Sequence, residues 1–171
     1  MSDKFTPVVQ EVELLVAEAR EMASEGLHFR ILHRFHEAGS VCRPGEEVAL
    51  VSFMHRSREI SLGLAVHLRL TFDYLARHRH TPLSAAEIAM GMKCDDFCSK
   101  HGAYAARGTP VRLVSPRSVK EYVKRIRRSL GWAFREAGLK VDPFEVLRSE
   151  STASNRVNYR LKCTAEWRHE G

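Results

Sequence analysis

The chain has 171 residues, of which 44% are hydrophobic, and a formal net charge of +6. This length suits one domain, or one domain with a short extension, and the hydrophobic fraction is large enough for a core. No apolar run reaches the roughly 18 residues that span a membrane, and no apolar leader segment is present. The four cysteines are too few for a disulfide scaffold. We therefore expect a cytoplasmic protein with no membrane partner.

The positive charge is concentrated in one segment. Residues 117–140 contain eight Lys or Arg and two Glu, a surplus of six that equals the surplus of the whole chain. Such a segment favours a polyanionic partner such as nucleic acid.

The N-terminal 45 residues are predicted to form a helical extension. Residues 6–25 begin with Thr6 and Pro7 and carry a helical apolar seam made of Val8, Val12, Leu15, Ala19 and Met22. This helix either packs on its own domain or forms a homodimer through its regular seam. Residues 27–39 fit both a strand-like alternation and a helix, and we favour a short helix that ends at Gly39. The loop over 39–45 is then the expected boundary to a second domain, residues 46–171.

The second domain begins with a predicted small antiparallel sheet and two helices. Its strands cover about 48–54 and 60–62, with a polar turn over 55–58. An apolar face predicts a helix over about 64–78. Ser84 and Glu87 have the spacing of a capping box, which predicts a short helix over about 85–92 that closes near Gly91.

A third, basic helix follows a loop. Residues 93–114 are predicted to be loop, with a short helix near 103–106. Ser115 is a candidate N-cap and Pro116 suits the first helical position, so the helix runs to about Ala137 and stops at Gly138. Its buried stripe is expected to consist of Val119, Val123, Ile126 and Leu130. A C-terminal hairpin is predicted from Val146–Leu147 and residues 157–161, with a polar turn over 149–155.

These elements resemble the OmpR/PhoB-type winged helix-turn-helix effector domain. The resemblance rests on Ser-Val-Lys-Glu-Tyr-Val-Lys-Arg-Ile-Arg-Arg-Ser-Leu at 118–130 and on Asn-Tyr-Arg-Leu at 158–161, and it covers about residues 46–163. Asn158 stands where the family usually has a wing glycine, and the N-terminal 45 residues are too short for a receiver domain. The resemblance implies a mostly helical α+β fold with an N-terminal sheet, three helices and a hairpin wing. It also implies double-stranded DNA as partner, with RNA polymerase as a further partner of the loop before the third helix.

The candidate DNA-binding residues follow from this fold. A recognition helix needs one apolar face to hold it and an opposite face that donates hydrogen bonds in the major groove. The cations of the third helix lie between its apolar positions, and an arginine at the hairpin tip suits the minor groove. The candidates are Arg117, Ser118, Lys120, Glu121, Lys124, Arg127, Arg128 and, in the hairpin, Arg156.

A second cluster carries metal-ligand chemistry. Cys94, Cys98 and His101 have a C-x3-C-x2-H spacing, but a clear fourth zinc ligand is missing. We therefore interpret these residues as ordinary loop side chains and expect no metal and no cofactor. A zinc site and a redox pair between the two cysteines are the alternatives.

The function predicted from the sequence is a transcription regulator that binds specific DNA sites, with no enzymatic activity, since no catalytic motif is present. A winged helix that docks on another protein is one alternative. A DNA-binding replication or mobile-element protein is the other.

Overall fold

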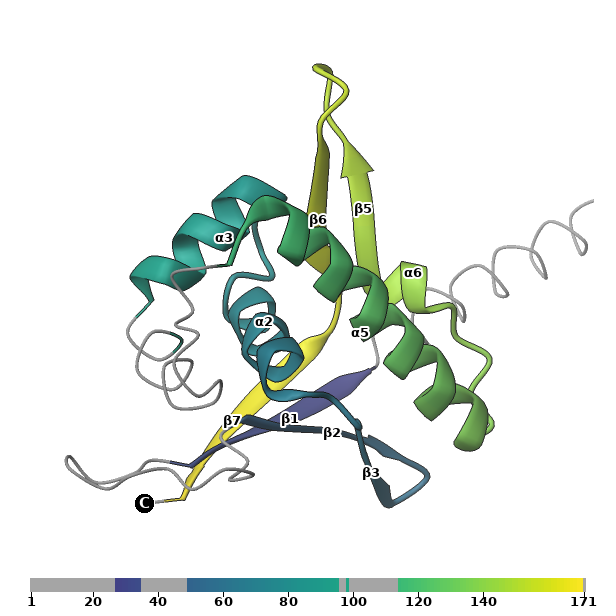
Figure 1. The fold of residues 1–171 in the computed structure, drawn as a ribbon. Helices are drawn as coiled ribbons and strands as arrows, with labels where there is room; N and C mark the ends of the chain where they lie inside the picture. The colour runs from purple at the N-terminus through teal and green to yellow at the C-terminus, as the bar shows by residue number, and fades with distance from the viewer. Residues whose placement is uncertain (1–26, 35–48, 96–97, 99–113, 171) are drawn as a thin grey trace, which may run out of the picture.

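The computed structural model describes residues 27–34, 49–95, 98 and 114–170, and this part of the chain has an α+β fold (Figure 1). Its elements in chain order are β1 (His28–Arg34), β2 (Ala49–His55), β3 (Arg58–Ser61), α2 (Val66–Arg77), β4 (Leu83–Ser84), α3 (Ala85–Cys94), α5 (Pro116–Glu136), α6 (Pro143–Val146), β5 (Leu147–Ser151), β6 (Val157–Leu161) and β7 (Thr164–Glu170). No helix in these ranges is long and apolar enough to cross a membrane.

A four-stranded sheet forms the base of the fold. Its order is β3-β2-β1-β7, and β1 pairs antiparallel with β2 and parallel with β7. The helix predicted over 27–39 is therefore wrong where the structure describes it, because residues 28–34 form a central strand. Residues 28–34 thus share a sheet with residues 49–61 instead of belonging to a separate helical extension. The helix predicted over 6–25, the boundary loop over 39–45 and the short helix near 103–106 lie outside the described residues.

The buried face of the sheet explains why β1 is a strand. Alternate residues from Leu27 to His33 are buried, which is the period of a strand and not of a helix. Aromatic side chains on this face pack against the helices. The ring centres of Phe29 and Phe72 of α2 are 5.0 Å apart, those of Phe53 and Phe134 of α5 are 5.5 Å apart, and both pairs are edge-on. Such pairs add to the free energy gained by burying the rings.

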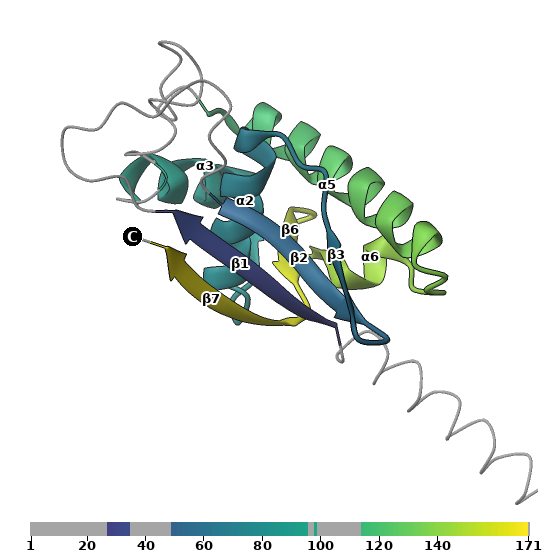
Figure 2. The same ribbon diagram turned by 90° about the horizontal axis from the view of Figure 1, so that it is seen from below.

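Three helices cover one side of this sheet. Figure 2 shows the strands in front and α2, α3 and α5 behind them. Nine consecutive residues of α2, from Leu68 to Ala76, are buried, so α2 is the central helix of the fold. In α3, a Cβ on Gly91 would lie 1.8 Å from the hydroxyl oxygen of Tyr74. Gly91 is therefore a point of close approach between α2 and α3, and the prediction that it closes the helix is wrong, since α3 continues to Cys94.

The two predicted N-caps are confirmed. Ser84 Oγ accepts a hydrogen bond from the backbone N–H of Glu87 at 3.1 Å, and Ser115 Oγ accepts one from the N–H of Ser118 at 3.1 Å. The predicted stop of the third helix is also confirmed. Gly138 has φ +72°, and the N–H of Leu139 donates to the carbonyl of Phe134 at 2.8 Å, the pattern of a Schellman C-cap.

A second sheet of order β4-β6-β5 carries the predicted C-terminal hairpin. The hairpin of β5 and β6 projects beyond the body of the molecule (Figure 1). The chain then returns to the first sheet as β7, a strand that the sequence analysis did not predict. Residues 28 and 164 lie opposite each other although 136 residues separate them.

A buried polar network ties the first sheet to α2. Asp73 of α2 is fully buried, and its Oδ1 accepts hydrogen bonds from His33 Nε2 at 2.7 Å and from Trp167 Nε1 at 2.8 Å. Its Oδ2 accepts one from Arg77 Nε at 2.9 Å. Arg77 also donates to both carboxylate oxygens of Asp95, at 2.6 and 2.9 Å. The network thus joins β1, β7, α2 and the end of α3.

Candidate nucleic-acid interface

The basic helix α5 is fixed by one apolar face. It has 21 residues, which at 1.5 Å per residue gives a length of about 31 Å. The predicted apolar stripe is confirmed as buried and consists of Val119, Val123, Ile126 and Leu130. Ala133 and Phe134 extend this buried face. The opposite face is therefore turned away from the core.

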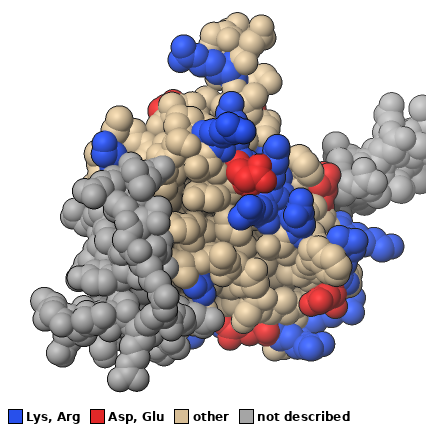
Figure 3. Space-filling model, viewed as in Figure 1, with Lys and Arg blue, Asp and Glu red and all other residues tan. Residues whose placement is uncertain are grey.

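Most of the predicted cations lie on that exposed face. Arg117, Lys120, Lys124 and Arg128 are exposed, as is Arg125, which the sequence analysis missed. Arg125 lies eight residues after Arg117 and four after Glu121, a helical spacing that could have identified it. Figure 3 shows Lys and Arg atoms gathered along α5 and at the end of the hairpin.

One carboxylate lies among these cations. Glu121 is 3.9 Å from Lys124 Nζ and 4.0 Å from Arg125 Nε. All three side chains are more than half exposed, so these ion pairs contribute little to stability. The exposed cations outnumber this carboxylate five to one, so the face has a strong positive charge.

Arg127 does not belong to this face. It is 9% exposed, and its Nε and Nη2 donate to the carbonyl of Leu147 at 2.9 and 2.7 Å. Its Nη2 also donates to Ser149 Oγ at 2.7 Å, and the guanidinium lies 4.4 Å from the ring centre of Phe144. The interpretation of Arg127 as a DNA contact is therefore corrected: its donors hold β5 against α5.

Ser118 serves the helix cap. It is half-buried, its N–H donates to Ser115 Oγ, and its hydroxyl lies 3.0 Å from the same oxygen. Its side chain is thus already hydrogen-bonded at the start of α5, beside the exposed Arg117 and Lys120.

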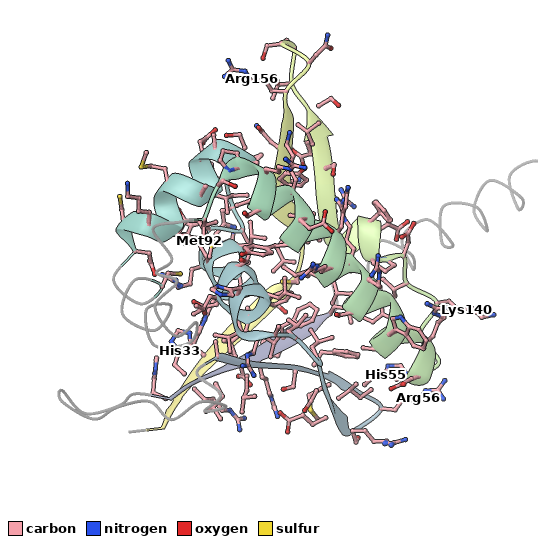
Figure 4. The ribbon with its side chains drawn as sticks, viewed as in Figure 1. His33, His55, Arg56, Met92, Lys140 and Arg156 are labelled. Carbon is pink, nitrogen blue, oxygen red and sulfur yellow. The ribbon has the colours of Figure 1, made fainter. Side chains whose placement is uncertain are left out.

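Arg156 lies at the hairpin tip, as predicted, and is exposed (Figure 4). The turn is closed by the N–H of Thr152, which donates to the carbonyl of Arg156 at 2.8 Å, and by the N–H of Asn155, which donates to the carbonyl of Thr152 at 3.0 Å. Asn155 takes the left-handed conformation, with φ 57°, that this turn requires. Lower in the hairpin, Arg160 Nη2 pairs with Glu150 across the strands at 2.8 Å.

A groove separates the hairpin from the start of α5. It has a volume of about 640 Å³ and is lined by three segments: the start of α3 (Ser84, Ala85, Ala86), the start of α5 (Pro116, Lys120) and the hairpin (Asn155, Arg156, Val157, Tyr159). Lys120 and Arg156 supply its charges and come from the two basic elements. The groove therefore brings together two of the predicted site residues that lie far apart in the sequence.

The predicted cysteine cluster is only partly described. Cys94 is exposed, whereas Cys98 is buried and its thiol lies 3.8 Å from Arg77 Nη2. Burial raises the pKa of the Cys98 thiol well above its usual range, which disfavours the thiolate that metal binding and redox exchange require. His101 lies outside the described residues. Within those residues, no three His, Cys, Asp or Glu side chains form a group that could hold a metal ion.

Comparisons with protein-family models, with curated proteins and with solved structures found no match to this chain.

Proposed function

We propose that this chain binds double-stranded DNA through a winged helix-turn-helix and acts as a transcription regulator. The observation that carries the proposal is the pairing of a capped helix, whose exposed face is cationic, with a projecting hairpin that has an arginine at its tip. In this proposal α2 and α3 are the first two helices of the motif, α5 is the recognition helix, and β5 and β6 form the wing.

The geometry of α5 supports insertion into the major groove. That groove admits one α-helix with its side chains, and Arg and Lys are the residues that most often contact guanine there. The exposed face of α5 offers Arg117 and Lys120 in its first turns and Lys124, Arg125 and Arg128 further along. The early cations suit base edges, and the later ones suit phosphates on the groove wall.

The wing supports a second contact. Arg156 lies across the groove from Lys120, so one strand of the DNA backbone could run between α5 and the hairpin. Arginine is favoured in a narrow minor groove because the potential there is strongly negative. Arg127 would contribute indirectly, since its hydrogen bonds fix the wing relative to the recognition helix.

Fluorescence anisotropy with a labelled random duplex tests DNA binding. Because cations that neutralise phosphates release counterions, log K should fall against log salt with a slope of about 0.9 per phosphate contacted. Lys124→Ala combined with Arg128→Ala removes two of the later cations, and it should weaken binding to every sequence and reduce the slope by about 2. Arg56→Ala combined with Arg58→Ala removes two exposed cations at the turn between β2 and β3; it is the matched control and should leave the affinity and the slope unchanged.

Two results would contradict the proposal. If wild-type protein does not bind duplex DNA even at low salt, that result favours the alternative of a winged helix that docks on another protein. If the Lys124 and Arg128 double variant binds DNA like the control variant of Arg56 and Arg58, the assignment of α5 as the recognition helix is wrong. Selection of bound duplexes from a random pool then gives the target site, and a repeated half-site would support the homodimer expected from the N-terminal seam.

A further inference from the structure

A second groove lies between the C-terminal half of α5 and α6. Its volume is about 630 Å³. The apolar residues that line it are Gly131, Phe134, Leu139, Val141, Pro143 and Phe144. Phe144 is 61% exposed, so a large apolar ring lies open to solvent at the edge of the groove. The volume falls within the range of about 300 to 1,000 Å³ that is typical of small-molecule sites.

The charged residues that line this groove are all cations. The charged residues that line it are Lys124, Arg127, Arg128 and Arg135, and no carboxylate is among the described lining residues. Lys124, Arg128 and Arg135 are exposed, whereas Arg127 is committed to the backbone of β5. The groove thus combines an apolar floor with cations that can bind an anion at its edge.

This combination limits the possible occupants. A second copy of the same face would bring like charges together, which disfavours association. A phosphate backbone would satisfy the cations but would leave the apolar floor uncovered. A small molecule with both an apolar body and an anionic group would satisfy both parts of the groove.

We propose that this groove binds a small amphipathic organic anion, an apolar body of one or two rings that carries a carboxylate or sulfonate. The rings lie against Phe144 and Val141, and the anionic group is held by Arg128 and Arg135. The groove is separate from the one beside the hairpin, with which it shares no lining residue.

The position of the groove gives the ligand a way to regulate DNA binding, and this consequence rests on the DNA-binding function proposed above. The groove shares Lys124 and Arg128 with the cationic face of α5, so a bound anion would neutralise part of that face. Phe144 also covers the guanidinium of Arg127, which holds the wing. Occupation of the groove should therefore lower the affinity for DNA.

The binding test uses the full chain and 1-naphthaleneacetate as the probe. A titration followed by backbone amide NMR should shift the signals of Gly131, Val141 and Phe144 in a saturable way. Naphthalene-1-methylamine, which has the same rings and the opposite charge, should bind at least about tenfold more weakly, because it cannot pair with the cations.

Two variants test the two parts of the site. Phe144→Ala removes an exposed ring and Arg135→Glu reverses an exposed charge, and each should weaken binding of 1-naphthaleneacetate about tenfold. Lys93→Glu makes the same change in net charge at an exposed residue of α3, on the opposite side of the molecule from α6 (Figure 1), and should leave the affinity unchanged. The proposal is overturned if both groove variants bind like wild type, if the shifted signals lie elsewhere, or if the amine binds as tightly as the acid.

The effect on DNA is measured separately, by anisotropy with and without saturating 1-naphthaleneacetate. A higher apparent Kd for DNA supports regulation through the groove, and an unchanged Kd overturns it. If the probe binds as expected but the protein does not bind DNA, the ligand site stands and the proposed DNA-binding function fails.

Discussion

Arg127 shows how one side chain among several similar cations can have a different role. Its neighbours Lys124 and Arg128 are exposed, but Arg127 lies beside the buried Ile126 and reaches the start of β5. Burial lowers the pKa of Arg127, while its donors bond to the Leu147 carbonyl and the Ser149 hydroxyl. The planar guanidinium carries several N–H donors in a fixed arrangement and can make these contacts at the same time, whereas a lysine ammonium lacks this arrangement of donors.

Replacing Arg127 should therefore change stability more than replacing Arg128. Arg127→Ala leaves the Leu147 carbonyl without these donors and removes a ring contact with Phe144, so we expect a loss of about 2 to 3 kcal/mol in the free energy of unfolding. Arg127→Lys should recover only a small part of this loss. Arg128→Ala, at an exposed position, should change stability by less than about 0.5 kcal/mol. Urea unfolding gives the free energy of unfolding of all three variants. Equal losses for Arg127→Ala and Arg128→Ala would refute the structural role of Arg127.

At the scale of elements, the sequence predicted what depends on local chemistry. The caps at Ser84 and Ser115, the stop at Gly138 and the buried stripe of α5 each involve residues within a few positions of one another. The exposed cationic face follows from that stripe, and so most of the candidate site could be predicted.

The elements that were missed depend on long-range pairing. Residues 27–39 fit both the strand period and the helix period, and residues 28–34 form a strand because they pair with β2 on one side and with β7 on the other, 136 residues later. The buried position of Arg127 likewise depends on partners 20 and 22 residues away. Gly91 was interpreted as a helix stop because its sequence neighbours do not reveal the Tyr74 ring packed against it.

Gly91 and Gly131, which lie inside α3 and α5, should respond in opposite ways to alanine. An added methyl at Gly91 would overlap the buried ring of Tyr74, and such overpacking costs about 1 to 3 kcal/mol, more than the gain of up to about 1 kcal/mol in helix propensity. At Gly131 the nearest atom is Pro143 Cγ at 3.3 Å, so Pro143 would have to move by only a few tenths of an ångström. We expect Gly91→Ala to lower Tm and Gly131→Ala to leave it near or above wild type, as measured by thermal unfolding. A Tm for Gly91→Ala at or above that of Gly131→Ala would contradict the close packing of α2 and α3.

At the scale of the whole molecule, the polar network around Asp73 and Asp95 connects parts that are distant in the sequence. It joins the parallel strands β1 and β7 to α2 through His33 and Trp167, and it joins α2 to the end of α3 through Arg77. The sheet at one side of the fold is thus linked by charged hydrogen bonds to Asp95 at the end of α3. Because Arg77 and Asp95 form an ion pair, the contribution of that pair to stability must depend on pH.

Asp95 determines the direction of that dependence. Burial alone would raise the pKa of Asp95, but hydrogen bonds from Arg77 and from the N–H of Cys98 outweigh burial and lower the pKa from 3.8 to about 2. A carboxyl whose pKa is lowered in the folded protein stabilises the fold fully at pH values above its pKa in the unfolded chain. This stabilisation is lost as the pH falls from about 4 through 2. The difference between the folded and unfolded pKa values corresponds to about 2 kcal/mol of stability, because the Asp95 carboxylate is only 14% exposed.

The unfolding free energies of wild type and Asp95→Asn should therefore differ by about this amount at pH 7 and converge near pH 2, as measured by urea unfolding across this range. A difference that stays constant down to pH 2 would show that the Arg77–Asp95 pair is not responsible.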